Sequence, residues 1–252
     1  MSDTSSPEDS FISHLVELRN RLMYAMGGFL LVAFFMLAIW PGQQKIYNLL
    51  AQPLLSALPA GSKMIATGVI SPFMTPLKLT LMSAFLVSLP WIFYQVWAFV
   101  APGLYDNEKK IVLPLVFSSS ALFACGVLYC YFIVFRFMFA LIYQMAPQSI
   151  AVTPDIENYL DFVLNMFLAF GIIFEVPVVV VVLVRMGVVS LEKLKDIRRY
   201  VIVGAFIIAA IVTPPDAVSQ LALAVPMCLL YELGLLIAPL FRKKVTEAAD
   251  HA

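Results

Sequence analysis

Residues 200–216 read YVIVGAFIIAAIVTPPD, and the 13 apolar residues 200–212 stop at Thr213, two prolines and Asp216. A helix rises about 1.5 Å per residue, so this run covers roughly 20 Å of a hydrocarbon core that is about 30 Å thick. Whether so short a helix crosses the bilayer decides how many passes the chain makes. We predict that it does cross, with local thinning of the bilayer around it.

The composition is that of a membrane protein. Hydrophobic residues make up 62% of the sequence, charged residues 13%, and the mean hydropathy is +0.93. These values lie far outside the range of soluble domains. The first apolar run follows a polar, net acidic segment without a small-residue cleavage pattern, so we expect a retained helix and not a signal peptide. The sequence predicts an all-α polytopic membrane protein.

Six apolar runs are candidate spans, the fifth and sixth of them short. They are residues 22–40, 77–100, 111–135, 159–184, 200–212 and 217–240. We expect a single membrane domain over residues 1–252. It comprises an amphipathic cytoplasmic segment (1–21), a six-helix core (22–240) and a cytoplasmic tail (241–252).

The distribution of basic residues predicts the orientation. With six spans, both termini share one side, and the segments on that side hold 12 of the 16 Lys and Arg residues. The other side holds Lys45, Lys63, Lys78 and Arg136. Because cytoplasmic segments are enriched in Lys and Arg, both termini are predicted to be cytoplasmic. Residues 46–50 suggest a short interfacial helix in the first outward segment, and the second, 136–158, looks similar.

Two acidic residues inside apolar runs are candidates for function, since a charge there costs on the order of 3 kcal/mol. Glu175 precedes Pro177, which removes a helix hydrogen bond and predicts a kink with a hydrated concave face. The alternative is a protonated Glu175 that joins helices structurally. Glu232 lies in the inner half of the last run, where it either snorkels or pairs with a basic loop.

Further polar residues occur between and before the runs. Thr213, Asp216 and Gln220 cluster where the fifth run turns into the sixth, and each could hydrogen-bond a partner helix for about 0.6–2 kcal/mol. Asp216 is equally suited to cap a helix. Apolar residues recur at helical spacing in 10–21, which predicts an amphipathic helix along the inner face with Glu17 and Arg19 projecting.

Motifs of membrane enzymes are absent from the sequence. There is no intramembrane serine protease motif, no pair of aspartates within spans and no phosphate loop. The three cysteines show no paired spacing, and the two histidines are near opposite ends, so no disulfide, metal site or cofactor is expected. We predict that the chain is not an enzyme and does not bind nucleic acid. Energy for transport would come from the proton-motive force or from a partner.

Four motifs occur in order along nearly the whole chain. They are SHLVELRNRL (13–22), WAFVAPGL (97–104) with Glu108 after it, FEVP (174–177), and TPPD (213–216) with Ser219 and Gln220 after it. Their conjunction resembles the TatC family, the receptor subunits of twin-arginine protein translocases. The resemblance implies a six-helix cupped scaffold in the bacterial cytoplasmic (inner) membrane. It also implies binding of twin-arginine signal peptides of folded proteins at the cytoplasmic face.

The same resemblance implies partners and residue roles. The partners are single-span TatA-type and TatB-type subunits, and further copies of the chain in a multimeric complex. The signal-binding carboxylates suit arginine, because a guanidinium group pairs with a carboxylate through two hydrogen bonds. The implied roles are signal binding for Phe99, Glu108, Glu17 and Arg19, the membrane cavity for Glu175, partner contact for Thr213 and Gln220, and functionally sensitive outer positions for Pro53 and Asp216.

Two other classes of protein stay open. An ion-coupled secondary transporter also places carboxylates in its spans, but it should show repeat symmetry, and the two three-span halves do not visibly match. A membrane assembly scaffold would explain the polar residues near 213–220, yet it leaves the carboxylates of the inner face without a task.

Overall fold

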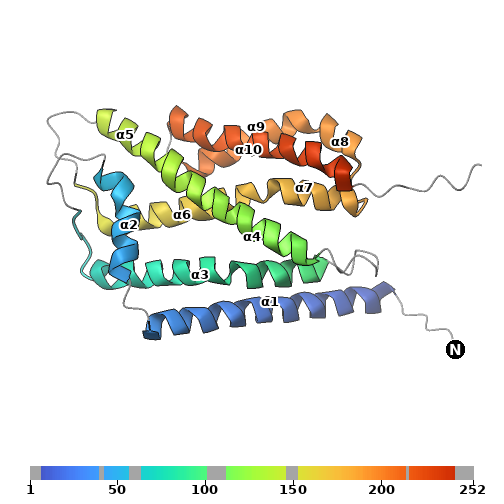
Figure 1. Ribbon diagram of the computed structural model, residues 1–252, viewed down its shortest axis with the longest axis horizontal. Coiled ribbons are helices and arrows are strands. Elements are labelled where there is room, and N and C mark those ends of the chain that lie inside the picture. The colour runs from blue at the N-terminus through green and yellow to red at the C-terminus, as the bar shows by residue number, and fades with distance from the viewer. Residues whose placement is uncertain are drawn as a thin grey trace, which may run out of the picture.

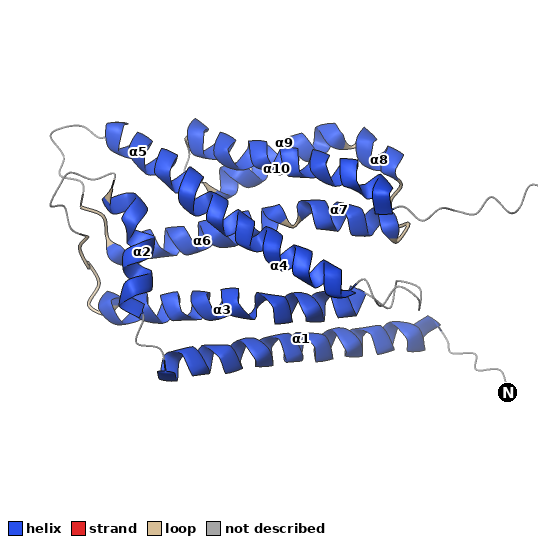
Figure 2. Ribbon diagram, viewed as in Figure 1, coloured by secondary structure: helices blue, strands red, loops and turns tan. Residues whose placement is uncertain are grey.

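The computed structural model describes residues 7–39, 43–56, 64–100, 112–145, 153–213 and 216–241, and most of them are helical (Figure 2). The helices are α1 (Pro7–Ile39), α2 (Gln43–Leu55), α3 (Ser71–Val100), α4 (Val112–Tyr129), η3 (Cys130–Val134), α5 (Phe135–Met145), α6 (Ile156–Phe174), α7 (Val176–Arg185), α8 (Leu191–Asp196), α9 (Arg198–Val212), α10 (Ala217–Ile237) and η4 (Ala238–Phe241). The all-α class is therefore confirmed.

The longer helices run side by side along the long axis of the molecule (Figure 1). Helix α1 begins and α10 ends at one end of the bundle, which we call the terminal end. Helix α2 lies across the opposite end, where α3 begins and α5 ends, and we call this the α2 end (Figure 1). A helix is thus present in the segment where a short interfacial helix was expected, and it is longer than residues 46–50.

Five stretches of the described residues are long and apolar enough to cross a membrane. They are Ile12–Ala38, Ser71–Val100, Val112–Ile142, Ile156–Arg185 and Ala217–Leu240. The fifth predicted run forms α9, whose 15 residues cover about 22 Å. The expectation of a short sixth helix was wrong. Its candidate span, Ala217–Leu240, has the expected bounds, and its 24 residues cover about 36 Å, more than a hydrocarbon core of about 30 Å.

Two helix boundaries differ from the sequence-based expectation. Helix α1 is continuous, so residues 10–21 extend the first span instead of forming a separate helix across the terminal end. The third run was expected to end at residue 135, but the π-helical segment η3 leads directly into α5, which ends at Met145. A single charged residue, Arg136, does not end a helix when the residues around it remain apolar and well suited to one.

The tightest packing brings α4 against α6. A Cβ atom on Gly126 of α4 would lie 2.5 Å from the backbone oxygen of Phe170 on α6. Phe170 itself is fully buried. Small residues allow such close contact between helices in membranes, where apolar burial alone does not hold helices together. Gly126 therefore sets how closely the two central spans approach.

A polar network joins the α2 end of α3 to α6. Asp155 caps α6 by accepting from the Asn158 amide at 3.0 Å, and its other oxygen accepts from the amide and hydroxyl of Thr67 at 3.0 and 2.8 Å. These hydrogen bonds hold the pKa of Asp155 below its ordinary value. Lys78 lies 2.7 Å from Asp161 and 3.1 Å from Glu157.

We predict that Gly126→Ala lowers the free energy of unfolding by about 1–3 kcal/mol, because the added methyl group meets backbone that cannot rotate away. Thermal unfolding in detergent measures the change. Gly204→Ala on α9 is the matched control, since a Cβ there has no heavy atom within 4 Å in the described structure. Equal stability of the two variants would contradict close packing at Gly126.

Candidate functional site

Helices α1 and α3 bring two of the implied signal-binding segments together at the terminal end. The ring of His14 stacks on that of Phe99, with ring centroids 4.5 Å apart and an interplanar angle of 21°. His14 lies one helical turn before Glu17. Glu17 is therefore one turn of α1 away from the point where α1 contacts Phe99 of α3. The sequence motifs that contain them are 75 or more positions apart, and the fold makes them neighbours.

Glu17 is only loosely engaged. The Arg21 Nη2 atom lies 3.5 Å from the Glu17 Oε1 atom. The Arg21 Nη1 atom donates to the Gln95 side-chain oxygen on α3 at 3.4 Å. The side chain of Glu17 is 32% exposed, so solvent screens this ion pair and keeps it weak. Arg19 is exposed, with a 3.5 Å contact to Asn20. Glu108, the first choice for a signal contact, lies outside the described residues.

Glu175 forms the junction between α6 and α7, and the predicted break in the fourth span is confirmed there. The cause is Pro177, which stands in the first turn of α7 and supplies no amide hydrogen. The expected hydrated face is not found at this side chain, which is only 9% exposed. Both carboxylate oxygens are buried, and no hydrogen-bond partner for them is found among the described residues.

A polar pair from α3 and α4 includes Ser119, a neighbour of Glu175. Trp97 donates its indole N–H to the buried hydroxyl of Ser119 at 3.0 Å. Ser119 is close enough to interact with the Glu175 carboxyl group, although without the geometry of a hydrogen bond. Glu175 therefore lies near a buried hydroxyl group between helices, as expected if it joins helices structurally. It lacks the hydrogen bonds that such a role needs.

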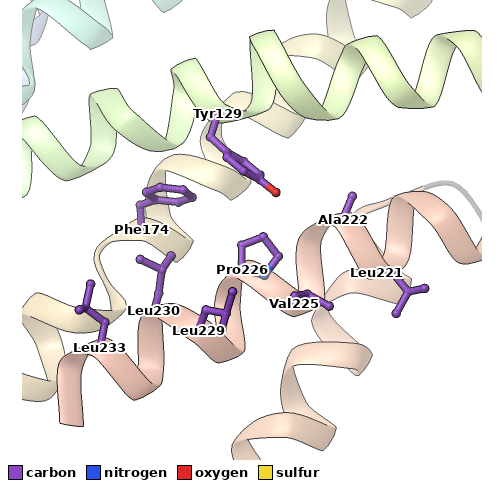
Figure 3. Close-up of a pocket in the computed structure, with 9 residues that line it drawn as sticks. All are labelled: Tyr129, Phe174, Leu221, Ala222, Val225, Pro226, Leu229, Leu230 and Leu233. Atoms are coloured by element: carbon purple, nitrogen blue, oxygen red, sulfur yellow. The ribbon is translucent and has the colours of Figure 1, made fainter. Parts of the chain in front are cut away.

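An apolar groove lies beside this junction and has a volume of about 660 Å³. Phe174 and Tyr129 form one wall, opposite Pro226 of α10 (Figure 3). The remaining lining residues all belong to α10: Leu221, Ala222, Val225, Leu229, Leu230 and Leu233. The concave surface is thus lined by Phe174, while the adjacent Glu175 is buried and is not among the lining residues.

The polar residues between α9 and α10 serve mainly to hold these helices. Thr213 is buried and donates to the Ala209 carbonyl at 2.8 Å, within its own helix. Asp216 caps α10 through the Ser219 amide at 2.7 Å, which confirms the capping alternative. Gln220 donates to the Phe206 carbonyl of α9 at 3.2 Å. Of the two implied partner contacts, only Gln220 is partly accessible.

Glu232 pairs with a basic segment, one of the two alternatives left open by the sequence. Arg198, at the start of α9, reaches both of its oxygens, at 2.6 and 2.9 Å. Tyr231 donates to the Leu194 carbonyl of α8 at 2.7 Å. Together these contacts hold the α8–α9 corner against α10, so Glu232 has a structural role.

The Lys78–Asp161 pair is the feature that sequence analysis missed. Both residues lie within the predicted runs 77–100 and 159–184, and both are charged, so the signal was present. Lys78 was counted as an outward residue and Asp161 was not weighed at all. Their pairing across 83 positions appears only in the fold.

These features define a polytopic α-helical membrane protein whose helices are joined by ion pairs such as Lys78–Asp161 and Arg198–Glu232. The chain belongs to the TatC family, because the sequence model of that family, the Sec-independent protein translocase protein (TatC), matches residues 13–226. A member of this family is a receptor component of the Sec-independent protein translocase, and not an enzyme. The family expected from the four motifs is confirmed.

Two curated relatives and one solved structure illustrate the similarity. The TatC protein of Haemophilus influenzae is 46% identical, over 98% of this chain and 94% of the relative. That of Escherichia coli K12 is 48% identical, over 91% of this chain and 88% of the relative. A crystal structure described as the twin-arginine translocase receptor TatC has a TM-score of 0.77 and 35% identity. It covers 90% of this chain and 99% of the solved one.

We predict that Glu175→Met raises the free energy of unfolding by about 1–3 kcal/mol, because it removes a buried carboxyl group that lacks hydrogen bonds. Glu232→Met is the matched control and should lower stability by up to about 1 kcal/mol, since it breaks the pair with Arg198. Thermal unfolding in detergent compares them. A loss of stability in Glu175→Met would show that the carboxyl group holds the helices together.

Proposed function

We propose that the terminal end binds the paired arginines of twin-arginine signal peptides carried by folded proteins. The observation that supports this most is the His14–Phe99 stack, which joins the α1 and α3 segments at one surface. Glu17 lies on that surface in a weak pair with Arg21. An incoming guanidinium group can replace this pair with a two-bond contact to the same carboxylate.

In this proposal Glu108 and Glu17 contact the arginines, Phe99 packs against the peptide, and Arg19 orients the surrounding charges. The apolar part of the peptide would then follow the membrane surface of the bundle toward the groove at Phe174. Glu175, buried beside that groove without a hydrogen-bond partner, is a group that an inserting peptide or partner helix can engage after a small opening of the α6–α7 junction.

The orientation that we propose places the terminal end in the cytoplasm. The predicted cytoplasmic segments hold most of the basic residues, and α1 begins at the same end of the bundle at which α10 ends (Figure 1). This requires α9 to cross as a sixth span of a bacterial inner membrane. We further propose single-span TatA-type and TatB-type partners, docking near Gln220, and transport driven by the proton-motive force.

The exposed face of α9 supports a partner helix there. Its outward residues Tyr200, Val203, Ile207 and Ile211 are each more than half exposed and recur every three or four positions. Gln220 is a partly accessible polar group beside that face. One polar group next to an apolar stripe selects a helix with a matching polar residue.

Photocrosslinking tests the receptor function directly. A twin-arginine signal peptide with a photoreactive residue next to the arginines should crosslink to membranes that contain the wild-type protein. We predict at least about a tenfold loss for Glu108→Ala, because a two-bond charged contact contributes about 1.5–3 kcal/mol. An Arg-Arg→Lys-Lys peptide should lose crosslinking in the same way.

The control is Asp196→Ala, which removes an exposed carboxylate on α8. It should crosslink as the wild type does. If folded Glu108→Ala also crosslinks like the wild type, Glu108 does not read the signal. If the folded wild type fails to crosslink at all, the secondary-transporter or scaffold alternatives gain support.

A further inference from the structure

A second groove lies at the α2 end, far from the proposed signal site, and has a volume of about 460 Å³. Its lining comes from two helical stripes. One is Gln52 and Pro53 of α2 with Ser56 directly after that helix, and the other is Tyr131, Phe132, Arg136 and Ala140 of η3 and α5. Phe132, Arg136 and Ala140 are spaced by four residues, so they share one face of the helix.

Arg136 is a cation of this groove without an ion-pair partner among the described residues. It is exposed, and within the described parts of the chain no carboxylate lies within ion-pair distance of its guanidinium group. Lys78, at the same end, differs because Asp161 and Glu157 both pair with it. The neighbours of Arg136 along the helix are apolar: Phe132 is 63% exposed and Phe137 is 66% exposed. A guanidinium group that lacks such a carboxylate and lies among exposed aromatic rings is available to bind an anion.

The depth of Arg136 in the membrane indicates which anion is near. It stands nine residues beyond the middle of the candidate span Val112–Ile142, or about 14 Å along the helix. Half of a hydrocarbon core is about 15 Å, so Arg136 lies at its edge. A long arginine side chain extends from such a position to the phosphate groups of the lipids. Helix α2 crosses the bundle at this same end (Figure 1).

We propose that this groove binds the headgroup of a membrane phospholipid. The guanidinium group of Arg136 donates to two oxygens of the phosphodiester, a geometry that planar guanidinium groups favour. The Ser56 hydroxyl already donates to the Pro53 carbonyl at 3.0 Å, so it accepts from a headgroup hydroxyl or ammonium. The amide of Gln52 lies at the same rim and both donates and accepts.

The aromatic residues of the groove hold the upper part of the lipid. The Tyr131 hydroxyl donates to the Leu49 carbonyl of α2 at 2.7 Å, which fixes its ring. The Phe132 ring stands at 87° to it, with centroids 4.9 Å apart. The two rings form an apolar floor for the glycerol backbone and the first methylene groups. The bound lipid would bridge α2 and α5, and Pro53 lies in contact with it.

The test uses full-length protein in phosphatidylcholine nanodiscs with a small fraction of photoreactive phosphatidylglycerol, and mass spectrometry locates the crosslinks. Wild-type crosslinks should concentrate in residues 131–140 and 52–56. Arg136→Gln should reduce them about fivefold, the effect expected of one cation near a lipid surface. Arg136→Lys keeps the charge but lacks the planar set of donors. Its crosslinking should lie between that of the wild type and that of Arg136→Gln.

Lys45→Gln is the matched control, because it removes an exposed cation of α2 that does not line the groove. It should leave crosslinking unchanged. Unchanged crosslinking in both Arg136 variants would overturn the proposal. Competition by soluble glycerol 3-phosphate would also overturn it, since the groove would then bind a free phosphate ester. The result is independent of signal-peptide binding, which occurs at the other end of the bundle.

Discussion

The attachment of α9 to α10 is the constraint on which the rest of the structure depends. Helix α9 is too short to match a hydrocarbon core of about 30 Å, so its position relies on its neighbour. Arg198 and Glu232 bind at one end, and Gln220 reaches the Phe206 carbonyl toward the other. Ala205 and Ala209 of α9 are fully buried, which allows close packing. Because α9 is held in this position, α10 runs back to the end of the bundle at which α1 begins (Figure 1).

Glu17 of α1 is bound less tightly than the charged residues at the α2 end. At the α2 end, Lys78 and Asp155 make several short contacts each, and the network ties α3 firmly to α6. At the terminal end the Arg198–Glu232 pair is equally short, but Glu17 and Arg21 of α1 meet only at 3.5 Å within one helix. A receptor needs charges that exchange partners at little cost, whereas a scaffold needs charges that are already satisfied. The difference is consistent with recognition at the terminal end.

The sequence predicted what depends on local patterns. Apolar runs located the helices, and Pro177 located the break at Glu175, because both follow from backbone chemistry. The extension of α5 past Arg136 was missed, since a charged residue was taken as the end of a run. The pairing of Lys78 with Asp161 and the His14–Phe99 stack were also beyond reach, because each joins distant positions. Glu175 was expected at a hydrated face, and its burial depends on packing by α3 and α4.

The most direct test of this account is the sidedness of α9. Single cysteines at Arg199→Cys and Ala217→Cys, in a variant without Cys125, Cys130 and Cys228, would be treated with a membrane-impermeant maleimide in intact cells and in inverted vesicles. If α9 crosses the membrane, the cysteine at 217 reacts from outside and the cysteine at 199 only from the cytoplasmic side. Labelling of both from the same side would show that α9 does not cross, and would contradict the account.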